Sequence, residues 1–190
     1  MAAMACGRTV AGGLALLIAC FWIASGQRPG DAPAAAPSSE FHFIRAEYRD
    51  LYRARGGFGR GWWMQDWPEA DHHFTLGIRR LTRLDTGEPR HLPLTDNRLF
   101  DYPWIYVTQA GYWNLSDAET ARLREYLLRG GFLVVDDFYG PQEWEVFREA
   151  MQRTLGDQPI LELEMDHPLM HVLFDIHEKT QIPGLRHLGI

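Results

Sequence analysis

The sequence predicts an α/β fold built on a parallel β-sheet. Residues 102–140 carry the main observation, because they have the pattern of a strand, a loop, a helix and a second strand, which is the crossover unit of a parallel sheet. The strands at 104–108 and 133–135 are apolar throughout rather than at alternate positions, as is typical of strands buried on both faces. The chain of 190 residues is 46% hydrophobic and 13% aromatic, which supports one globular domain with a substantial core.

The sequence of the helix in this unit carries a signal for its start, an apolar face at helical spacing and a signal for its end. Ser116 and Glu119 form an S-x-x-E capping box, in which each side chain binds a backbone N–H group near the helix start. Gly130 stands where a left-handed cap is expected, since glycine enters positive φ without the steric cost of a Cβ atom. Apolar residues lie on or near one face between these signals: Ala121, Leu123, Tyr126 and Leu127.

The first 26 residues have the pattern of an export signal. Arg8 is the only charge before an apolar run at 10–24, and small residues suited to cleavage follow. A retained membrane anchor is an alternative, although the run is short for a spanning helix. Residues 17–20 also resemble a bacterial lipoprotein box, and in this third alternative Cys20 carries a lipid. Each alternative exports the rest of the chain, which is then periplasmic or anchored to the membrane and facing outside the cytoplasm.

The remainder divides into a linker and one predicted domain. Residues 27–40 are rich in Pro, Ala and Ser and show no periodicity, which indicates a linker. Residues 41–190 form the predicted α/β domain. Its last residues, 183–190, have the pattern of the start of another strand, so we expect the domain to be truncated at the C-terminus of this sequence.

Further elements are expected on both sides of the crossover unit. Strands are predicted at 41–46, 91–94 and 160–163, and the last of these alternates, which places it nearer a sheet edge. Helices are predicted at 71–84 and 143–155, where apolar residues recur at helical spacing.

Composition and charge exclude several kinds of function. The net charge of −6 argues against a nucleic-acid partner, because proteins that bind nucleic acid normally carry a basic face. Cys6 and Cys20 are the only cysteines and both precede the predicted domain, so that domain holds no disulfide and no thiolate. Ser116, the only serine of the domain, is assigned to the helix cap. The sequence therefore predicts no enzyme with a Cys or Ser nucleophile.

Two carboxylates and a histidine are the candidates for catalysis. Asp136 and Asp137 end a predicted buried strand, and ligands bind beyond the carboxyl ends of parallel strands. His167 follows the strand predicted at 160–163, which we expect at or near the same edge. These three residues can share acid–base work or hold a divalent metal, although no pattern requires a cofactor. The alternative is structural, with the aspartates capping a loop and His167 packing at a turn with Pro168.

Four further residues are candidates for ligand binding. Gln109 and Tyr139 follow the two strands of the crossover unit at its carboxyl edge. Trp62 and Trp63 follow a glycine-rich stretch, and their rings can stack on a sugar. The alternative for both tryptophans is that they close over the core. We expect the glycines to form a surface loop, and a phosphate-binding loop is the less favoured alternative, since no Walker lysine is present.

Several strings of the sequence together resemble a known family. They are GRGWWMQDWPEADHHFTLGIRRLTRLDT, LFDYPWIYVTQAGYW, LSDAETARLREYLLRGGFLVVDDFYG and DHPLMHVLFDI. Over residues 41 to the end, the chain is similar to the bacterial domain of unknown function 4159. The resemblance implies a flavodoxin-like three-layer sandwich with a mostly parallel sheet, akin to the class I glutamine amidotransferases, in an exported or membrane-tethered protein. Where amidotransferases carry a nucleophilic cysteine after a strand, this chain has Gln109, which removes amidotransferase activity from consideration.

These observations leave three functional hypotheses. The first is a cell-envelope domain that binds a ligand or partner without thiol chemistry, with a carbohydrate or cell-wall component as the first ligand class. The second is a hydrolase that uses Asp136, Asp137 and His167, with or without a divalent metal. The third is a scaffold in a membrane-associated assembly with a protein partner. The sequence does not decide whether the protein is an enzyme.

Overall fold

The computed structural model describes residues 38–51 and 61–180, which belong to one compact unit over Ala35–Ile190. The predicted export signal at 1–26 and most of the linker at 27–40 lie outside the described residues, as do the glycine-rich stretch and the C-terminal end. Within the described ranges, no helix is both long and apolar enough to cross a membrane.

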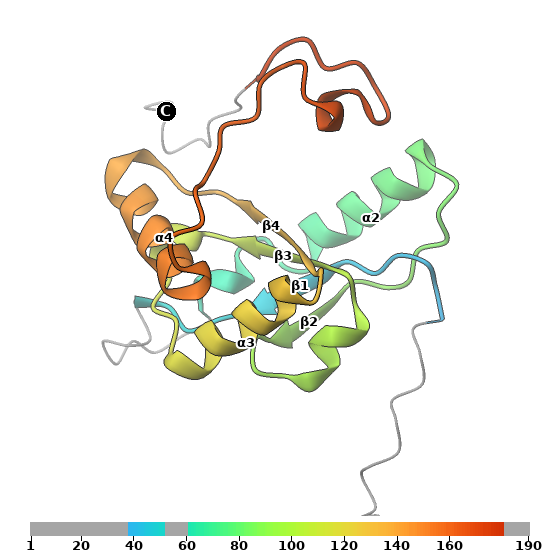
Figure 1. Cartoon of the computed structure of the whole chain (residues 1–190). Coiled ribbons are helices and arrows are strands. Elements are labelled where there is room, and N and C mark those ends of the chain that lie inside the picture. Colours follow the sequence, from blue (N-terminus) through green and yellow to red (C-terminus); the bar gives the residue numbers. More distant parts are fainter. Residues whose placement is uncertain (1–37, 52–60, 181–190) are drawn as a thin grey trace, which may run out of the picture. The chain divides into compact units, whose positions relative to one another are not determined.

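The described strands form one parallel sheet in the order β2-β1-β3-β4 (Figure 1). The predicted α/β class with a parallel sheet is therefore confirmed. The crossover unit is confirmed as well, because its two strands are direct neighbours in register over five pairs of residues, from Trp104 beside Phe132 to Thr108 beside Asp136. The strands are β1 (Ile44–Glu47), β2 (Arg90–Pro93), β3 (Trp104–Thr108) and β4 (Phe132–Asp136).

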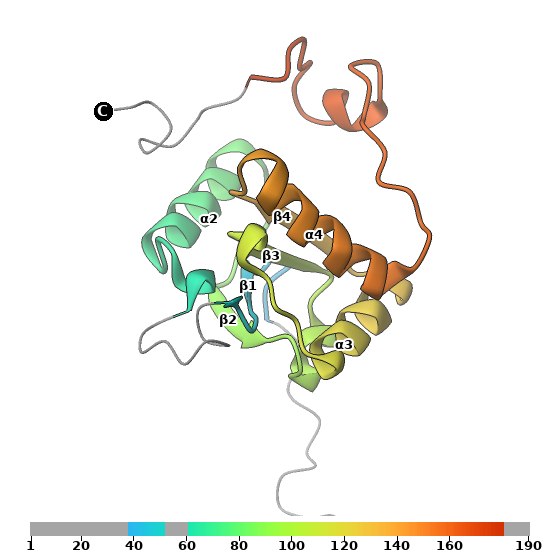
Figure 2. The same cartoon turned by 90° about the vertical axis from the view of Figure 1, so that its left-hand side faces the viewer.

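Three α-helices cover the sheet, with α2 on one side and α3 and α4 packed together on the other (Figure 2). The α-helices are α2 (Glu69–Leu81), α3 (Asp117–Leu128) and α4 (Gly140–Leu155). Short 3₁₀ helices connect the main elements: η1 (Trp62–Met64), η2 (Asn97–Asp101), η3 (Ala110–Tyr112) and η4 (Pro168–His171).

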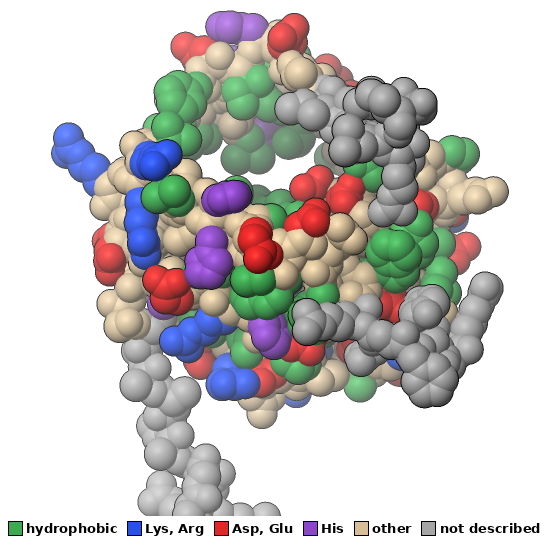
Figure 3. All heavy atoms as spheres, turned by 180° about the vertical axis from the view of Figure 1, so that it is seen from behind, with side chains coloured by type: hydrophobic (Ala, Val, Ile, Leu, Met, Phe, Trp, Pro, Cys, Tyr) green, Lys and Arg blue, Asp and Glu red, His purple; other side chains and the backbone are tan. Residues whose placement is uncertain are grey.

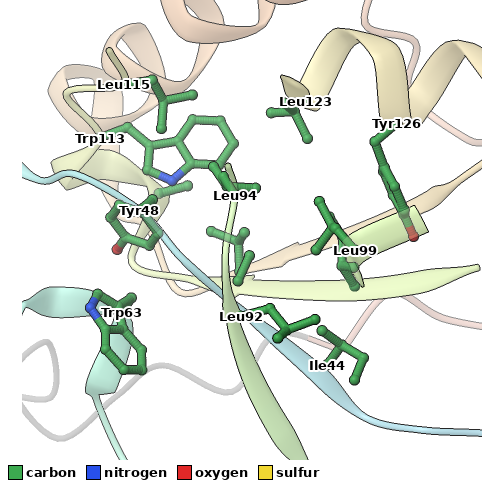
Figure 4. Close-up of a cluster of buried hydrophobic side chains, with 14 of the residues drawn as sticks. Ile44, Tyr48, Trp63, Leu92, Leu94, Leu99, Trp113, Leu115, Leu123 and Tyr126 are labelled. Atoms are coloured by element: carbon green, nitrogen blue, oxygen red, sulfur yellow. The ribbon is translucent and has the colours of Figure 1, made fainter. Parts of the chain in front are cut away.

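The two faces of the sheet differ because successive side chains of a strand point to opposite sides. Toward α2 the sheet is aromatic, and Phe43 and Trp104 pack against Phe74 of that helix. Toward α3 the sheet is mostly aliphatic. Figure 4 shows Ile44 of β1 in the same buried cluster as Leu123 of α3. Apolar side chains on both faces explain why the central strands lack the polar alternation of a half-exposed sheet.

Local signals around α3 are confirmed. The Ser116 hydroxyl accepts from the Glu119 N–H group at 3.3 Å, and the Glu119 carboxylate accepts from the Ser116 N–H group at 2.8 Å, which completes the capping box. Gly130 has a φ of 92°, as expected for a left-handed position after a helix. The helix therefore begins and ends where its sequence indicates.

Other boundaries differ from the prediction. Helix α2 begins at Glu69 rather than 71 and ends at Leu81 rather than 84, and α4 begins at Gly140 rather than 143. The strand predicted at 160–163 is wrong: this stretch is not a strand, and Leu161 is 73% exposed. Alternation made the stretch suitable for an edge strand, but a strand forms only where a neighbour supplies its hydrogen bonds.

Candidate functional site

The strand order places a topological switch point between β1 and β3. The chain leaves β1 for β2 on one side and later enters β3 on the other side. In open parallel sheets a crevice forms at such a point, beyond the carboxyl ends of the strands, and ligands bind there. The residues that directly follow β1 and β3 are Tyr48 and Gln109, so these positions define the candidate site.

Tyr48 ties the two strand ends together. Its buried hydroxyl donates to the backbone carbonyl oxygens of Thr108, at 2.8 Å, and of Gln109, at 3.1 Å. Burial first, and then the nearby carboxylate of Asp50, raise the pKa of the Tyr48 phenol above its ordinary value. The hydroxyl therefore stays protonated, and its hydrogen bonds link the end of β1 to the end of β3.

Gln109 and Asp137 form a polar pair at the ends of β3 and β4. Both have a left-handed backbone, with φ of 56° and 64°, a conformation that costs a residue other than glycine about 1–3 kcal/mol. The Gln109 amide donates to one carboxylate oxygen of Asp137, and the Tyr139 hydroxyl donates to the other. The predicted ligand-binding residues Gln109 and Tyr139 thus meet on a carboxylate that was predicted for catalysis.

Asp136 has a different partner from Asp137. Its carboxylate accepts from the Tyr106 hydroxyl at 3.2 Å, and the Asp136 side chain is exposed. Burial first, and then the Asp136 carboxylate, raise the pKa of the Tyr106 phenol. Strand β4 ends at Asp136 and the left-handed backbone of Asp137 breaks the alternation of the strand, so the two aspartates have separate partners: Tyr106 for Asp136, and Gln109 and Tyr139 for Asp137.

An aromatic pair lies at the same edge. Trp62 of η1 stacks on Tyr112 of η3, with ring centroids 4.3 Å apart and planes 10° apart. The Tyr112 N–H group donates to the Gln109 carbonyl oxygen at 3.0 Å, so this pair is one tight turn away from the polar cluster. The Asp50 carboxylate holds the start of η1, where it accepts from the Trp62 N–H group at 2.8 Å.

Trp63 lies in the core rather than at the edge. Its side chain is only 6% exposed, and its ring packs against the imidazole of His91, with centroids 5.1 Å apart. This placement matches the core alternative that the sequence left open for the two tryptophans. Trp62 and Trp63 therefore differ in surroundings although they are adjacent in sequence.

His167 belongs to the segment after α4, residues 157–180, which we call the C-terminal arm. The Leu169 N–H group donates to the His167 ring at 3.2 Å, so the histidine caps η4. Among the described residues, no three His, Cys, Asp or Glu side chains gather as metal ligands do. The structure thus does not join His167 with Asp136 and Asp137.

Sequence reasoning missed a buried ion pair beneath the site. Arg45 of β1 and Asp71 of α2 are each 1% exposed, and the Arg45 Nε atom lies 2.9 Å from the Asp71 carboxylate. Arg45 also donates to the carbonyl oxygens of Trp63 and Gln65, at 3.0 and 2.9 Å, and lies against the ring of Tyr106. The available signal was an arginine within an apolar strand, because a buried charge requires a partner.

A family model described as Domain of unknown function (DUF4159) matches residues 42–187. No curated protein matches the chain. The matched range includes all four strands, the three α-helices and the arm, so the candidate site lies within it.

Proposed function

The chain belongs to the DUF4159 family, whose description states no activity, and we propose that it is a binding module for a polyhydroxylated ligand. The ligand class is a carbohydrate or a carbohydrate-containing cell-wall component. The observation that supports this proposal is that the Gln109–Asp137–Tyr139 cluster and the Trp62–Tyr112 pair lie at the same edge of the sheet, joined by the backbone bond from Tyr112 to Gln109. The export signal predicted at 1–26 supports a location where such ligands occur.

The chemistry of the cluster suits sugar hydroxyls. A carboxylate accepts hydrogen bonds at both oxygens, an amide both donates and accepts, and a phenol does either. Hydroxyl groups of a sugar can therefore replace the internal bonds between Gln109, Asp137 and Tyr139 one for one. Aromatic rings beside such a cluster offer an apolar surface for the C–H groups of a sugar ring.

The backbone of the site supports binding as well. Residues with a positive φ cluster at ligand sites, where the surrounding structure holds them in place. The Tyr48 hydroxyl holds the backbone at Gln109 through its bonds to the carbonyl oxygens of Thr108 and Gln109. The Gln109 N–H group donates to the Asp136 carbonyl oxygen at 3.0 Å, which ties the end of β3 to the residue before Asp137. A site that is organised before binding loses less conformational entropy when the ligand arrives.

We also propose a more specific fold, the flavodoxin-like three-layer sandwich. The order β2-β1-β3-β4 equals the first four strands of the flavodoxin-like order 2-1-3-4-5, which supports a flavodoxin-like three-layer sandwich. In the amidotransferases of related fold a cysteine follows a strand, and Gln109 stands after β3 here. This supports ligand binding without a thiol step.

Glycan binding by the purified chain tests the proposal. On an array that includes soluble peptidoglycan fragments, we expect a saccharide signal that Trp62→Ala and Asp137→Ala each weaken about tenfold, equal to about 1.4 kcal/mol. Phe132→Ala is the matched control, because this exposed aromatic residue lies at the amino end of β4. A wild-type protein that binds no saccharide would contradict the ligand class, provided that its thermal unfolding shows a folded protein.

A further inference from the structure

An open cavity lies outside the candidate site, between α4 and the start of the C-terminal arm. Its volume is about 340 Å³. This size falls in the range of small-molecule sites, about 300–1,000 Å³. Trp144 and Met151 of α4 and Ile160 of the arm provide the apolar part of its lining, and Gln152, Asp157 and Gln158 provide polar groups.

The sequence explains why these side chains meet. Trp144, Met151 and Gln152 are seven and eight residues apart, so they share one face of α4. Gly156 ends the helix with a φ of 70°, which any residue with a Cβ atom adopts at a cost. The chain turns at this glycine, and the arm places Ile160 against the same face.

Trp144 is held in a fixed position. Its ring packs against Phe138, at a centroid distance of 5.9 Å, and against Phe147, at 5.7 Å. Those two phenylalanines stack on each other at 5.1 Å. The indole is therefore part of a rigid aromatic cluster, and rigid aromatic surfaces bind ligands at a low entropic cost.

The polar groups around the cavity are available to a ligand. The side chains of Gln152, Asp157 and Gln158 are exposed, and among the described residues none of them, nor the indole N–H of Trp144, forms a hydrogen bond with another protein group. Arg148, which also lines the cavity, is by contrast paired with Glu145 at 2.8 Å. The free groups are amides, a carboxylate and an N–H donor rather than cations.

We propose that this cavity is a second saccharide site, which binds one acetamido sugar of a glycan. The sugar ring packs on Trp144, and its acetamido methyl group contacts Met151 and Ile160. The hydroxyl and amide groups bind Gln152, Asp157 and Gln158. The lining favours a neutral ligand over an anion, because it includes the carboxylate of Asp157 and its arginine, Arg148, is paired with Glu145.

Calorimetric titration of the full chain with chitotriose, the trimer of N-acetylglucosamine, tests the second site. Cellotriose, which has no acetamido groups, is the comparison ligand. We expect Trp144→Ala and Gln158→Ala to weaken chitotriose binding about tenfold, or to remove one of two binding events. Arg122→Ala is the control, since it changes a half-buried residue of α3 away from the cavity.

The outcomes separate this inference from the proposed function. Unchanged chitotriose binding in Trp144→Ala overturns the second site, whatever Trp62→Ala does. If Trp144→Ala loses chitotriose binding and Trp62→Ala leaves saccharide binding unchanged, the result supports the cavity as a binding site and contradicts the site at the switch point. Equal affinity for cellotriose overturns the acetamido assignment. Thermal unfolding of Trp144→Phe, which keeps a ring in the aromatic cluster, separates loss of the ligand surface from loss of folding.

Discussion

At the residue scale, Arg45 and Asp71 show how a charge becomes part of a hydrophobic core. Arg45 stands in β1 between Ile44 and Ala46, which face the aliphatic side, while its own side chain turns toward α2. Burying a guanidinium alone is costly, but Asp71 and the carbonyl oxygens of Trp63 and Gln65 satisfy it. The pair thereby fixes α2 and η1 on the sheet beneath the candidate site.

Removing Asp71 tests how much the buried ion pair contributes to the free energy of unfolding. We expect Asp71→Ala to lower the free energy of unfolding by about 3–5 kcal/mol, because Arg45 is left buried without a counter-charge. Asp117→Ala is the matched control: it also removes an aspartate from a pair with arginine, at 3.0 Å, but this pair is exposed. The control should cost less than about 1 kcal/mol. Equal losses in urea unfolding would refute the role of the buried pair.

His42 predicts a pH dependence of stability. Burial first, and then the cation of Arg90, lower the pKa of the His42 imidazole below its ordinary value of 6.5. The unfolded chain therefore takes up this proton at a higher pH than the folded chain. Stability is complete above the unfolded pKa and falls as the pH drops from there toward the folded pKa.

His42→Gln isolates this contribution, since glutamine does not titrate. We expect the variant to lose less stability than the wild type between about pH 7.5 and pH 5, as measured by urea unfolding at each pH. All other titrating groups are shared and cancel in the comparison. Parallel pH profiles for the two proteins would show that His42 titrates alike in the folded and unfolded chains.

At the element scale, the crossover unit was predictable because its signals are local. Ser116, Glu119 and Gly130 lie within one helix, and capping needs no distant partner. The stretch 160–163 shows the opposite case, since pairing of a strand depends on a neighbour from elsewhere in the chain. Helix starts were misplaced for a related reason, because the actual cap of α2, Pro68, is not a residue that caps through a side chain.

The placement of Gln109, Asp137 and Tyr139 at one edge was predictable, because the carboxyl ends of neighbouring parallel strands lie at the same edge of a sheet. The partners of the site were not found. Arg45 and Asp71 are 26 residues apart, and only the packing of α2 on the sheet brings them together. The Trp62–Tyr112 stack depends on η1 and η3, which have no sequence signal of their own.

The capping box of α3 gives a prediction at this scale. We expect Ser116→Ala to destabilise the protein by about 1 kcal/mol, because the Glu119 N–H group loses its acceptor at the helix start. Ser116→Thr keeps a hydroxyl that can accept from the Glu119 N–H group and donate to the Glu119 carboxylate, so it is the matched variant, with little loss expected. Thermal or urea unfolding measures both. If the two variants lose equal stability, the cap contributes nothing measurable.

At the scale of the whole molecule, charge points to a neutral ligand. The chain carries a net charge of −6, and acidic side chains are visible on the face that Figure 3 shows. The described residues at and beside the carboxyl edge include Asp50, Asp136, Asp137 and Glu143. Of the described arginines near this edge, Arg45 is already paired with Asp71, whereas Arg49 is exposed. A phosphate or other anion would meet a negative potential, whereas a neutral sugar would not.

The salt dependence of ligand binding tests whether the ligand is neutral. For the uncharged saccharide that gives the strongest array signal, we expect the dissociation constant to change less than about twofold when the sodium chloride concentration rises from about 50 to about 500 mM, because no charge pair forms on binding. A weakening of tenfold or more would show that charge attraction drives binding.

The most direct test of the central claim is the location of the bound ligand. Amide resonances of the ¹⁵N-labelled full chain, followed during titration with the uncharged saccharide that gives the strongest array signal, report that location without any substitution. The largest shifts are predicted at Gln109, Tyr112 and Asp137–Tyr139, at the carboxyl edge of the sheet. Shifts confined to the opposite edge, around Phe100 and Gly131, or to the cavity around Trp144 and Ile160 would contradict the proposed function, as would a spectrum that the saccharide leaves unchanged.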